Sequence, residues 1–196
     1  MTTLFRRLCL KVHHWLLASC EVARFEGIVI ADIRHPDNRT QRFPEVMLAA
    51  LQLLKATDPC RFARVRRRLS WISFQGMAGR SAEYQHSLRQ CWIDFRDPAD
   101  DADAELLTGW CASTLVHQAT HGTINTRGVP YSPELRSRIE ELCVKQEQKF
   151  IQRLAITHPS LAQQLHREFD ASEWEGIWNS TRWEQFRRDI KHLLSS

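Results

Sequence analysis

The segment "WCASTLVHQATHG", residues 110–122, constrains the fold of this chain more than any other feature. Its first seven residues are almost wholly apolar, which predicts a helix buried inside the protein. His117 and His121 lie four residues apart, so their imidazoles project from the same face of that helix. Buried imidazoles need partners for their nitrogens, and a metal ion is one such partner. The fold must therefore bring polar groups or a metal to a core helix.

The hydrophobic pattern predicts an α+β fold in which a small antiparallel sheet is flanked by mostly helical structure. Glycine supplies only seven of the 196 residues, and helix formers are abundant. The predicted helices cover 4–18, 44–56, 59–68, 103–122, 132–156 and 160–169. The predicted strands cover 25–33, 69–76 and 87–95, and the last two are expected to pair antiparallel across the connection 76–86.

A zinc site needs a third protein ligand besides the two histidines. The predicted helix after residue 131 offers three candidate glutamates. Glu140 lies among apolar residues, Glu141 is its neighbour, and Glu147 follows two turns later on the face of Glu140. The spacing alone does not decide which of the three glutamates would be the third ligand.

The stretches "LVHQATHGTI" and "YSPELRSRIEELCVKQEQKF" together resemble zinc metallopeptidases of the gluzincin type, in their minimal single-domain form. The resemblance covers about residues 60 to 155. It implies a zincin-like metal helix, a Zn cofactor held by His117, His121 and Glu140, and a peptide or protein substrate. It further implies that "SWISFQG" or "RQCWIDF" forms the strand at the cleft edge. We expect a zincin-like domain over 1–156 and a C-terminal helical appendage, 157–196, packed on it.

The chain departs from that family at Gln118, where the family has glutamate. The glutamate takes a proton from the attacking water and passes it to the leaving amine, whereas glutamine cannot accept a proton. The resemblance therefore implies an inactive or nearly inactive peptidase. Either the natural protein is a pseudoenzyme, or glutamate has been replaced to inactivate an enzyme; the otherwise intact site favours replacement slightly. Tyr131, in the loop between the two helices, is a candidate oxyanion stabiliser or a packing residue, and Tyr84 is equally ambiguous.

The N-terminal segment is predicted to be a packed amphipathic helix rather than a secretion signal. Its apolar residues recur at helical spacing, at Leu4, Leu8, Val12, Trp15 and Leu16. Charged and polar side chains, among them Lys11, interrupt the apolar run that a signal would need. A membrane-associated protein, anchored through this helix or a lipidated Cys20, is a weaker reading. The six cysteines form no CxxC pair, and we expect reduced, buried thiols in a cytoplasmic protein.

An alternative function is a non-catalytic interaction protein. It would use the basic segment 61–68, which carries five arginines, or the Trp-rich tail with Trp174, Trp178 and Trp183. An ordinary solvated helix, with Phe62, Val65 and Leu69 turned inward, explains the arginines better. The net charge of +4 demands no nucleic-acid partner, and we expect neither a nucleic-acid nor a membrane partner.

Overall fold

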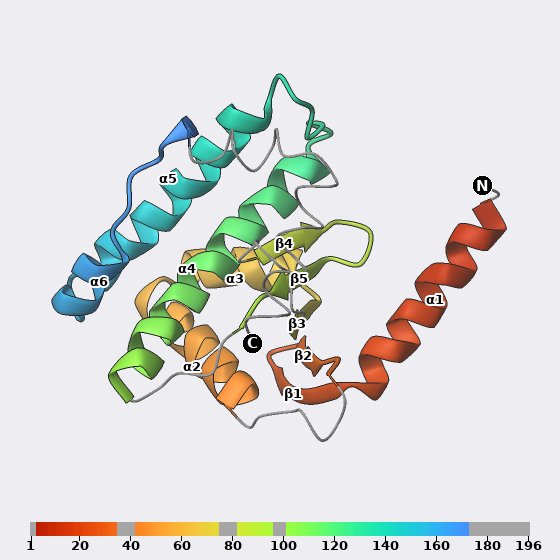
Figure 1. Ribbon diagram of the computed structural model, residues 1–196, viewed down its shortest axis with the longest axis horizontal. Helices are drawn as coiled ribbons and strands as arrows, with labels where there is room; N and C mark the ends of the chain where they lie inside the picture. Colours follow the sequence, from red (N-terminus) through yellow and green to blue (C-terminus); the bar gives the residue numbers. More distant parts are fainter. Residues whose placement is uncertain (1–2, 35–41, 75–81, 96–100, 173–196) are drawn as a thin grey trace, which may run out of the picture.

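The structure, a computed structural model, describes residues 3–34, 42–74, 82–95 and 101–172, with the backbone alone for 3–7 and 9. Among these residues the chain forms six helices and five strands (Figure 1). The elements are α1 (Thr3–Ser19), β1 (Glu21–Phe25), β2 (Ile28–Asp32), α2 (Arg42–Thr57), α3 (Pro59–Arg68), β3 (Trp71–Phe74), β4 (Ala82–Gln85), β5 (Gln90–Ile93), α4 (Asp101–Thr126), α5 (Arg136–Leu154) and α6 (Pro159–Leu165). The predicted α+β class is confirmed.

The sheet is mixed rather than antiparallel, with strand order β1-β2-β3-β5-β4. β2 and β5 both run parallel to β3, while β1 and β4 are antiparallel edge strands. The predicted antiparallel pairing of 69–76 with 87–95 is therefore wrong. Part of the connection between them, 82–85, is itself a strand that pairs with β5, and the chain thus re-enters the sheet in the direction of β3.

The predicted single strand 25–33 is two strands joined by a tight turn. Glu26 and Gly27 both have positive φ, 44° and 87°, as a two-residue hairpin of mirror-image type requires. The backbone reverses there, so Phe25 pairs with Ile28. β2 thereby becomes an interior strand, buried at every position.

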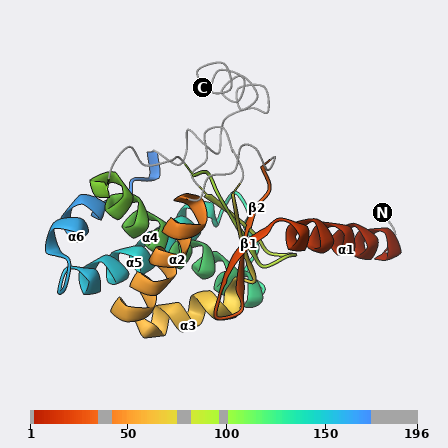
Figure 2. The ribbon, with the colours of Figure 1, turned by 90° about the horizontal axis from the view of Figure 1, so that it is seen from below.

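The core lies between the sheet and the helices. Helices α2 to α6 lie on one side of the sheet, whereas α1 projects from the other side (Figure 2). The central helix is α4, which packs against α2, α3, α5, α6 and β4. It runs to Thr126 and does not end at Gly122 as predicted. The glycine with left-handed backbone geometry that follows the end of α4 is Gly128, at φ 74°, and not Gly122.

Gly122 permits a close approach between α4 and the edge strand β4. A Cβ at this position would lie 2.8 Å from the Tyr84 hydroxyl and 2.9 Å from its Cζ. We expect Gly122→Ala to lower the free energy of unfolding by about 1–3 kcal/mol, because the rigid tyrosine ring must move. Urea unfolding monitored by circular dichroism measures this change.

Gly109 on the same helix is the matched control. A Cβ there would meet the methyl ends of Leu165 and Leu161, at 2.7 and 3.2 Å, which can turn away. Both substitutions gain the same helix propensity, so their difference reports the contact with Tyr84. An equal effect of the two substitutions on stability would contradict the role assigned to Gly122.

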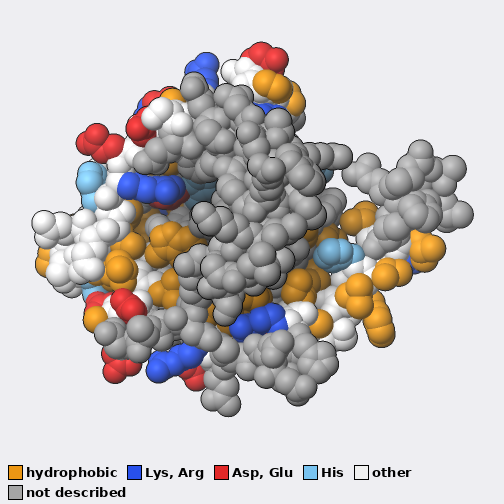
Figure 3. Space-filling view, in the orientation of Figure 1, with side chains coloured by type: hydrophobic (Ala, Val, Ile, Leu, Met, Phe, Trp, Pro, Cys, Tyr) orange, Lys and Arg blue, Asp and Glu red, His pale blue; other side chains and the backbone are white. Residues whose placement is uncertain are grey.

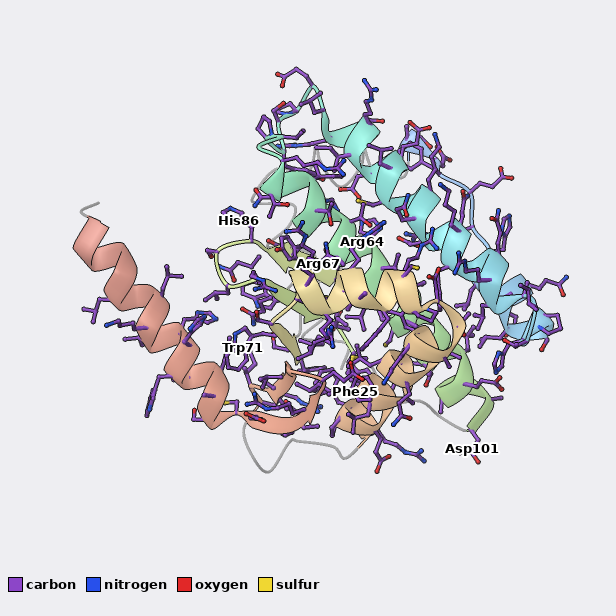
Figure 4. All side chains as sticks on the ribbon, turned by 180° about the vertical axis from the view of Figure 1, so that it is seen from behind. Phe25, Arg64, Arg67, Trp71, His86 and Asp101 are labelled. Carbon is purple, nitrogen blue, oxygen red and sulfur yellow. The ribbon has the colours of Figure 1, made fainter. Side chains whose placement is uncertain are left out.

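The predicted packing of the first helix is wrong. Leu8, Val12, Trp15 and Leu16 are 48–69% exposed. Among the described residues, α1 joins the body near its C-terminal end, through buried Leu17 and a ring contact of His14 with Trp71. Figure 4 shows Trp71 between the sheet and this end of α1. None of the described helices combines the length and apolar character needed to cross a membrane.

Helix α3 follows the prediction closely. The Asp58 side chain caps it by accepting a hydrogen bond from the Arg61 backbone at 3.1 Å, and Phe62 and Val65 point into the core, as does Leu69 just after it. Figure 4 shows Arg64 and Arg67 on this helix. The arginines contact neighbouring side chains: Arg61 contacts Asp58 and Gln146, Arg64 contacts Gln146, and Arg66 contacts Glu26. These contacts favour an ordinary helix surface over a binding face.

The remaining boundaries differ in detail. Helix α5 begins at Arg136, after a turn in which Leu135 and Arg136 donate to the Ser132 carbonyl, rather than at residue 132. Helix α6 packs on α4 and α5. The predicted Trp-rich tail and the rest of 173–196 lie outside the described residues. The described cysteines are free thiols, but Cys60 is exposed and Cys20 half-buried, contrary to the expectation that all are buried.

Candidate metal centre

The two histidines of α4 face α5. His117 is 5% exposed and His121 is half-buried. Their Nε2 atoms lie 3.0 Å apart, and their ring centroids lie 4.9 Å apart. The four-residue spacing on one helix therefore brings both nitrogens to one point, as the sequence predicts.

The helix α5 supplies a carboxylate to the same point. Glu140 is 2% exposed, and its Oε2 lies 3.0 Å from His117 Nε2. Its Oε1 lies 3.5 Å from His121 Nε2. Tyr131 lies at the rim, where its hydroxyl donates to Glu140 Oε1 at 2.6 Å and its ring packs edge-on against His121. The structure thus brings together four of the predicted site residues, and Tyr131 orients the Glu140 carboxylate.

The other two glutamates have different surroundings. Glu141 is on the outer side of α5 and pairs with Lys145 at 2.7 Å. Glu147 is buried, 4% exposed, and its Oε1 contacts Nδ1 of His117, the ring nitrogen that points away from Glu140 and His121. Arg167, just after α6, donates to the same oxygen at 3.3 Å. Glu147 therefore orients the His117 ring from behind, the position at which carboxylates support metal-binding histidines.

The charges of this cluster shift the proton affinities of its members. Burial lowers the pKa of His117, but hydrogen bonds to Glu140 and Glu147 and their charges outweigh it and raise the pKa to about 9. Burial raises the pKa of Glu140, but its contacts with His117 and His121 leave that pKa well below its ordinary value. In the metal-free chain at neutral pH, His117 is thus a cation between two carboxylates. A metal ion binding at Nε2 must displace a proton.

Cys143 is a donor that sequence reasoning missed. Its thiol is fully buried, and one ligand atom each from His117, His121 and Cys143 lie within 4.8 Å of one another. Burial, together with the charges of Glu140 and Glu147, raises the pKa of the thiol, so it is protonated without a metal. The sequence does contain a signal for this candidate ligand, because Cys143 comes three residues after Glu140 and therefore lies on the same face of α5.

Gln118 follows His117 on α4 and is also buried, 5% exposed. Its Oε1 accepts no hydrogen bond from the residues that the structure describes. A buried oxygen without a donor costs about 1–3 kcal/mol. The side chain is three residues before His121, and therefore on the side of α4 that carries the second histidine.

The strand beside α4 is not one of the two that the sequence predicts for the cleft edge. β3 and β5, whose sequences are "WISF" and "QCWI", are interior strands with neighbours on both sides. The edge strand that packs on α4 is β4, which places Tyr84 against Gly122. Tyr84 donates to the Arg68 carbonyl at 3.4 Å, away from the imidazoles. An edge strand has free backbone groups along one side and can pair with an extended peptide.

Comparisons of the chain with known protein families, with curated proteins and with solved structures find no match. The cluster on α4 and α5 is therefore interpreted from its own chemistry.

Proposed function

We propose that this chain binds one divalent metal ion, zinc, through Nε2 of His117, Nε2 of His121 and the carboxylate of Glu140. We further propose that it is a metallopeptidase-like protein, inactive or nearly so, because Gln118 stands in the position of the general base. A bound zinc ion would supply a Lewis acid that polarises a carbonyl group. An extended peptide pairing with the edge of β4 would be the substrate or ligand.

The observation that carries the proposal is the convergence of three donors from two helices. Donor atoms around a tetrahedral zinc ion lie roughly 3.3 Å apart, given metal–nitrogen bonds of about 2.0–2.1 Å. Here His117 Nε2 lies 3.0 Å from His121 Nε2 and 3.0 Å from Glu140 Oε2, and the other carboxylate oxygen, Oε1, lies 3.5 Å from His121 Nε2. Imidazole and carboxylate are zinc ligands, and the contact of Glu147 with the far nitrogen of His117 leaves Nε2 for the metal.

We expect the purified protein to carry one equivalent of zinc and His121→Ala to carry almost none. The substitution removes one of three ligands and leaves the Glu147 contact with His117 intact. Elemental analysis after dialysis measures the zinc content. His166→Ala, at an exposed histidine beyond α6, is the matched control and should retain full zinc. Metal-free wild-type protein that takes up no zinc on reconstitution would exclude the proposal.

A second candidate function is a purely structural metal site. Cys143 favours it, because a fourth protein donor would close the coordination sphere and leave no position for a substrate. The site would then hold α4 and α5 together, and the lack of a base at Gln118 would have no consequence.

Cobalt substitution separates the two candidates. Under the first proposal, the cobalt form should lack the near-ultraviolet band of a thiolate ligand, and Cys143→Ser should lower metal affinity less than threefold. A thiolate band that disappears in Cys143→Ser, with a loss of affinity of about a hundredfold or more, would support the structural site instead.

A further inference from the structure

Apolar side chains are exposed along α1. Among the described residues, four of the ten large hydrophobic side chains that face solvent belong to this helix: Leu8 at 59%, Val12 at 50%, Trp15 at 69% and Leu16 at 48% exposed. Figure 3 shows hydrophobic side chains over α1, on the right of the view. Such a group of apolar side chains marks an interaction surface when it is contiguous.

These four side chains form one stripe, which faces away from the protein body. At 100° per residue, they fall within an arc of about 100° on the helix. Leu17, which is 2% exposed and anchors α1 to the body, lies about 140° from Val12 and about 160° from Trp15 on the helix circumference. The helix itself extends clear of the other elements (Figures 1 and 2). A flat surface can therefore reach the stripe along its length.

The charge of α1 has one sign. Its sequence contains Arg6, Arg7 and Lys11 and no aspartate or glutamate. Lys11 is exposed and is next to the stripe on the helical circumference. Basic residues beside an apolar face that contains tryptophan are the composition of helices that lie in the headgroup region of anionic bilayers.

We propose that α1 binds the surface of membranes that contain anionic lipids, with Leu8, Val12, Trp15 and Leu16 inserted between the headgroups. Two other occupants fit less well. A second copy of α1 would bring basic residues together without any acidic partner. A protein partner would need a groove to receive a convex helix, whereas a bilayer offers apolar depth and negative charge at once. The proposal is independent of the metal centre.

The test is sedimentation of the full-length protein with vesicles. We expect the protein to pellet with vesicles of phosphatidylglycerol mixed with phosphatidylcholine, and to stay in the supernatant with phosphatidylcholine alone. The double variant Leu8→Ser/Trp15→Ser should reduce the partition coefficient by roughly two orders of magnitude, about tenfold for each apolar side chain. Raising the salt concentration should weaken binding as well.

Two further variants keep the result interpretable. Ile156→Ser, at an 82% exposed residue after α5, should bind like wild type. Lys11→Glu leaves the apolar stripe intact and should reduce binding to the anionic vesicles. Circular dichroism and urea unfolding show that each variant is folded. Absence of pelleting with wild type, equal pelleting with both vesicle types, or binding that the α1 variants do not change would overturn the proposal; so would self-association that those variants abolish in place of vesicle binding.

Discussion

Zinc-loaded Gln118→Glu should hydrolyse peptides about 10²–10⁴ times faster than the zinc-loaded wild-type chain. General-base assistance is worth a factor of that size, and glutamate differs from glutamine here chiefly in its ability to accept a proton. The position is buried beside His117, and the Gln118 Oε1 lacks a donor among the described residues. Initial rates on a library of quenched fluorescent peptides measure the change.

Two controls distinguish catalysis from a change in folding or a contaminating protease. Gln118→Met has a similar side-chain length but no proton acceptor, so it should show no gain. Gln118→Glu combined with His121→Ala should lose the gain with the metal. A Gln118→Glu protein with full zinc occupancy and no activity on any peptide would exclude the peptidase-like proposal and favour the structural site.

His117→Ala should lower the free energy of unfolding of the metal-free protein by about 3–5 kcal/mol. The imidazolium contacts Glu140 on one side and Glu147 on the other, and both carboxylates are buried. Removal of the cation leaves these charges in the interior with less compensation, which is the costly way to break a buried ion pair. Urea unfolding in the presence of a chelator measures the effect without any contribution from bound metal.

A double variant and a surface variant complete this experiment. His117→Ala/Glu147→Gln removes one stranded charge and should recover part of the lost stability, so the two substitutions should not be additive. His166→Ala, on the surface, should stay within about 0.5 kcal/mol of wild type. A loss below about 1 kcal/mol for His117→Ala would mean that the ion cluster is not formed in the folded protein.

The local part of the candidate site could be predicted from the sequence. A helix places residues four apart on one face, so the convergence of His117 and His121 follows from spacing alone. The apolar run before them predicts burial, and α4 is indeed the central helix. Glu140 is one of three glutamates at workable positions, and only the packing of α5 on α4 distinguishes it from Glu141 and Glu147.

The rest depended on contacts that spacing does not encode. The sequence predicts that Cys143 and Glu147 lie on the same face of α5 as Glu140. Which side of the His117 ring each one approaches depends on how α5 packs against α4, which spacing does not determine. The direction of β5 was mispredicted because β4 was not recognised as a strand. β4 has four residues and follows a glycine-bearing segment, so the pattern of this stretch predicts a simple connection between two antiparallel strands. For α1, the periodicity correctly predicts an apolar stripe, but it does not indicate whether another element covers that stripe. The prediction of a packed helix was therefore wrong although the pattern is present.

The candidate metal ligands and the residues that orient them, Tyr131 and Glu147, belong to α4, α5 and the loop between them, within residues 117–147. His117 and Glu147 are thus only 30 residues apart, and their contact closes one antiparallel helical hairpin. Closing so short a loop has a small entropic cost, and such local contacts form early during folding. The hairpin can therefore assemble these side chains before β2 pairs with β3, because the paired residues of those two strands, such as Val29 and Trp71, are farther apart along the chain.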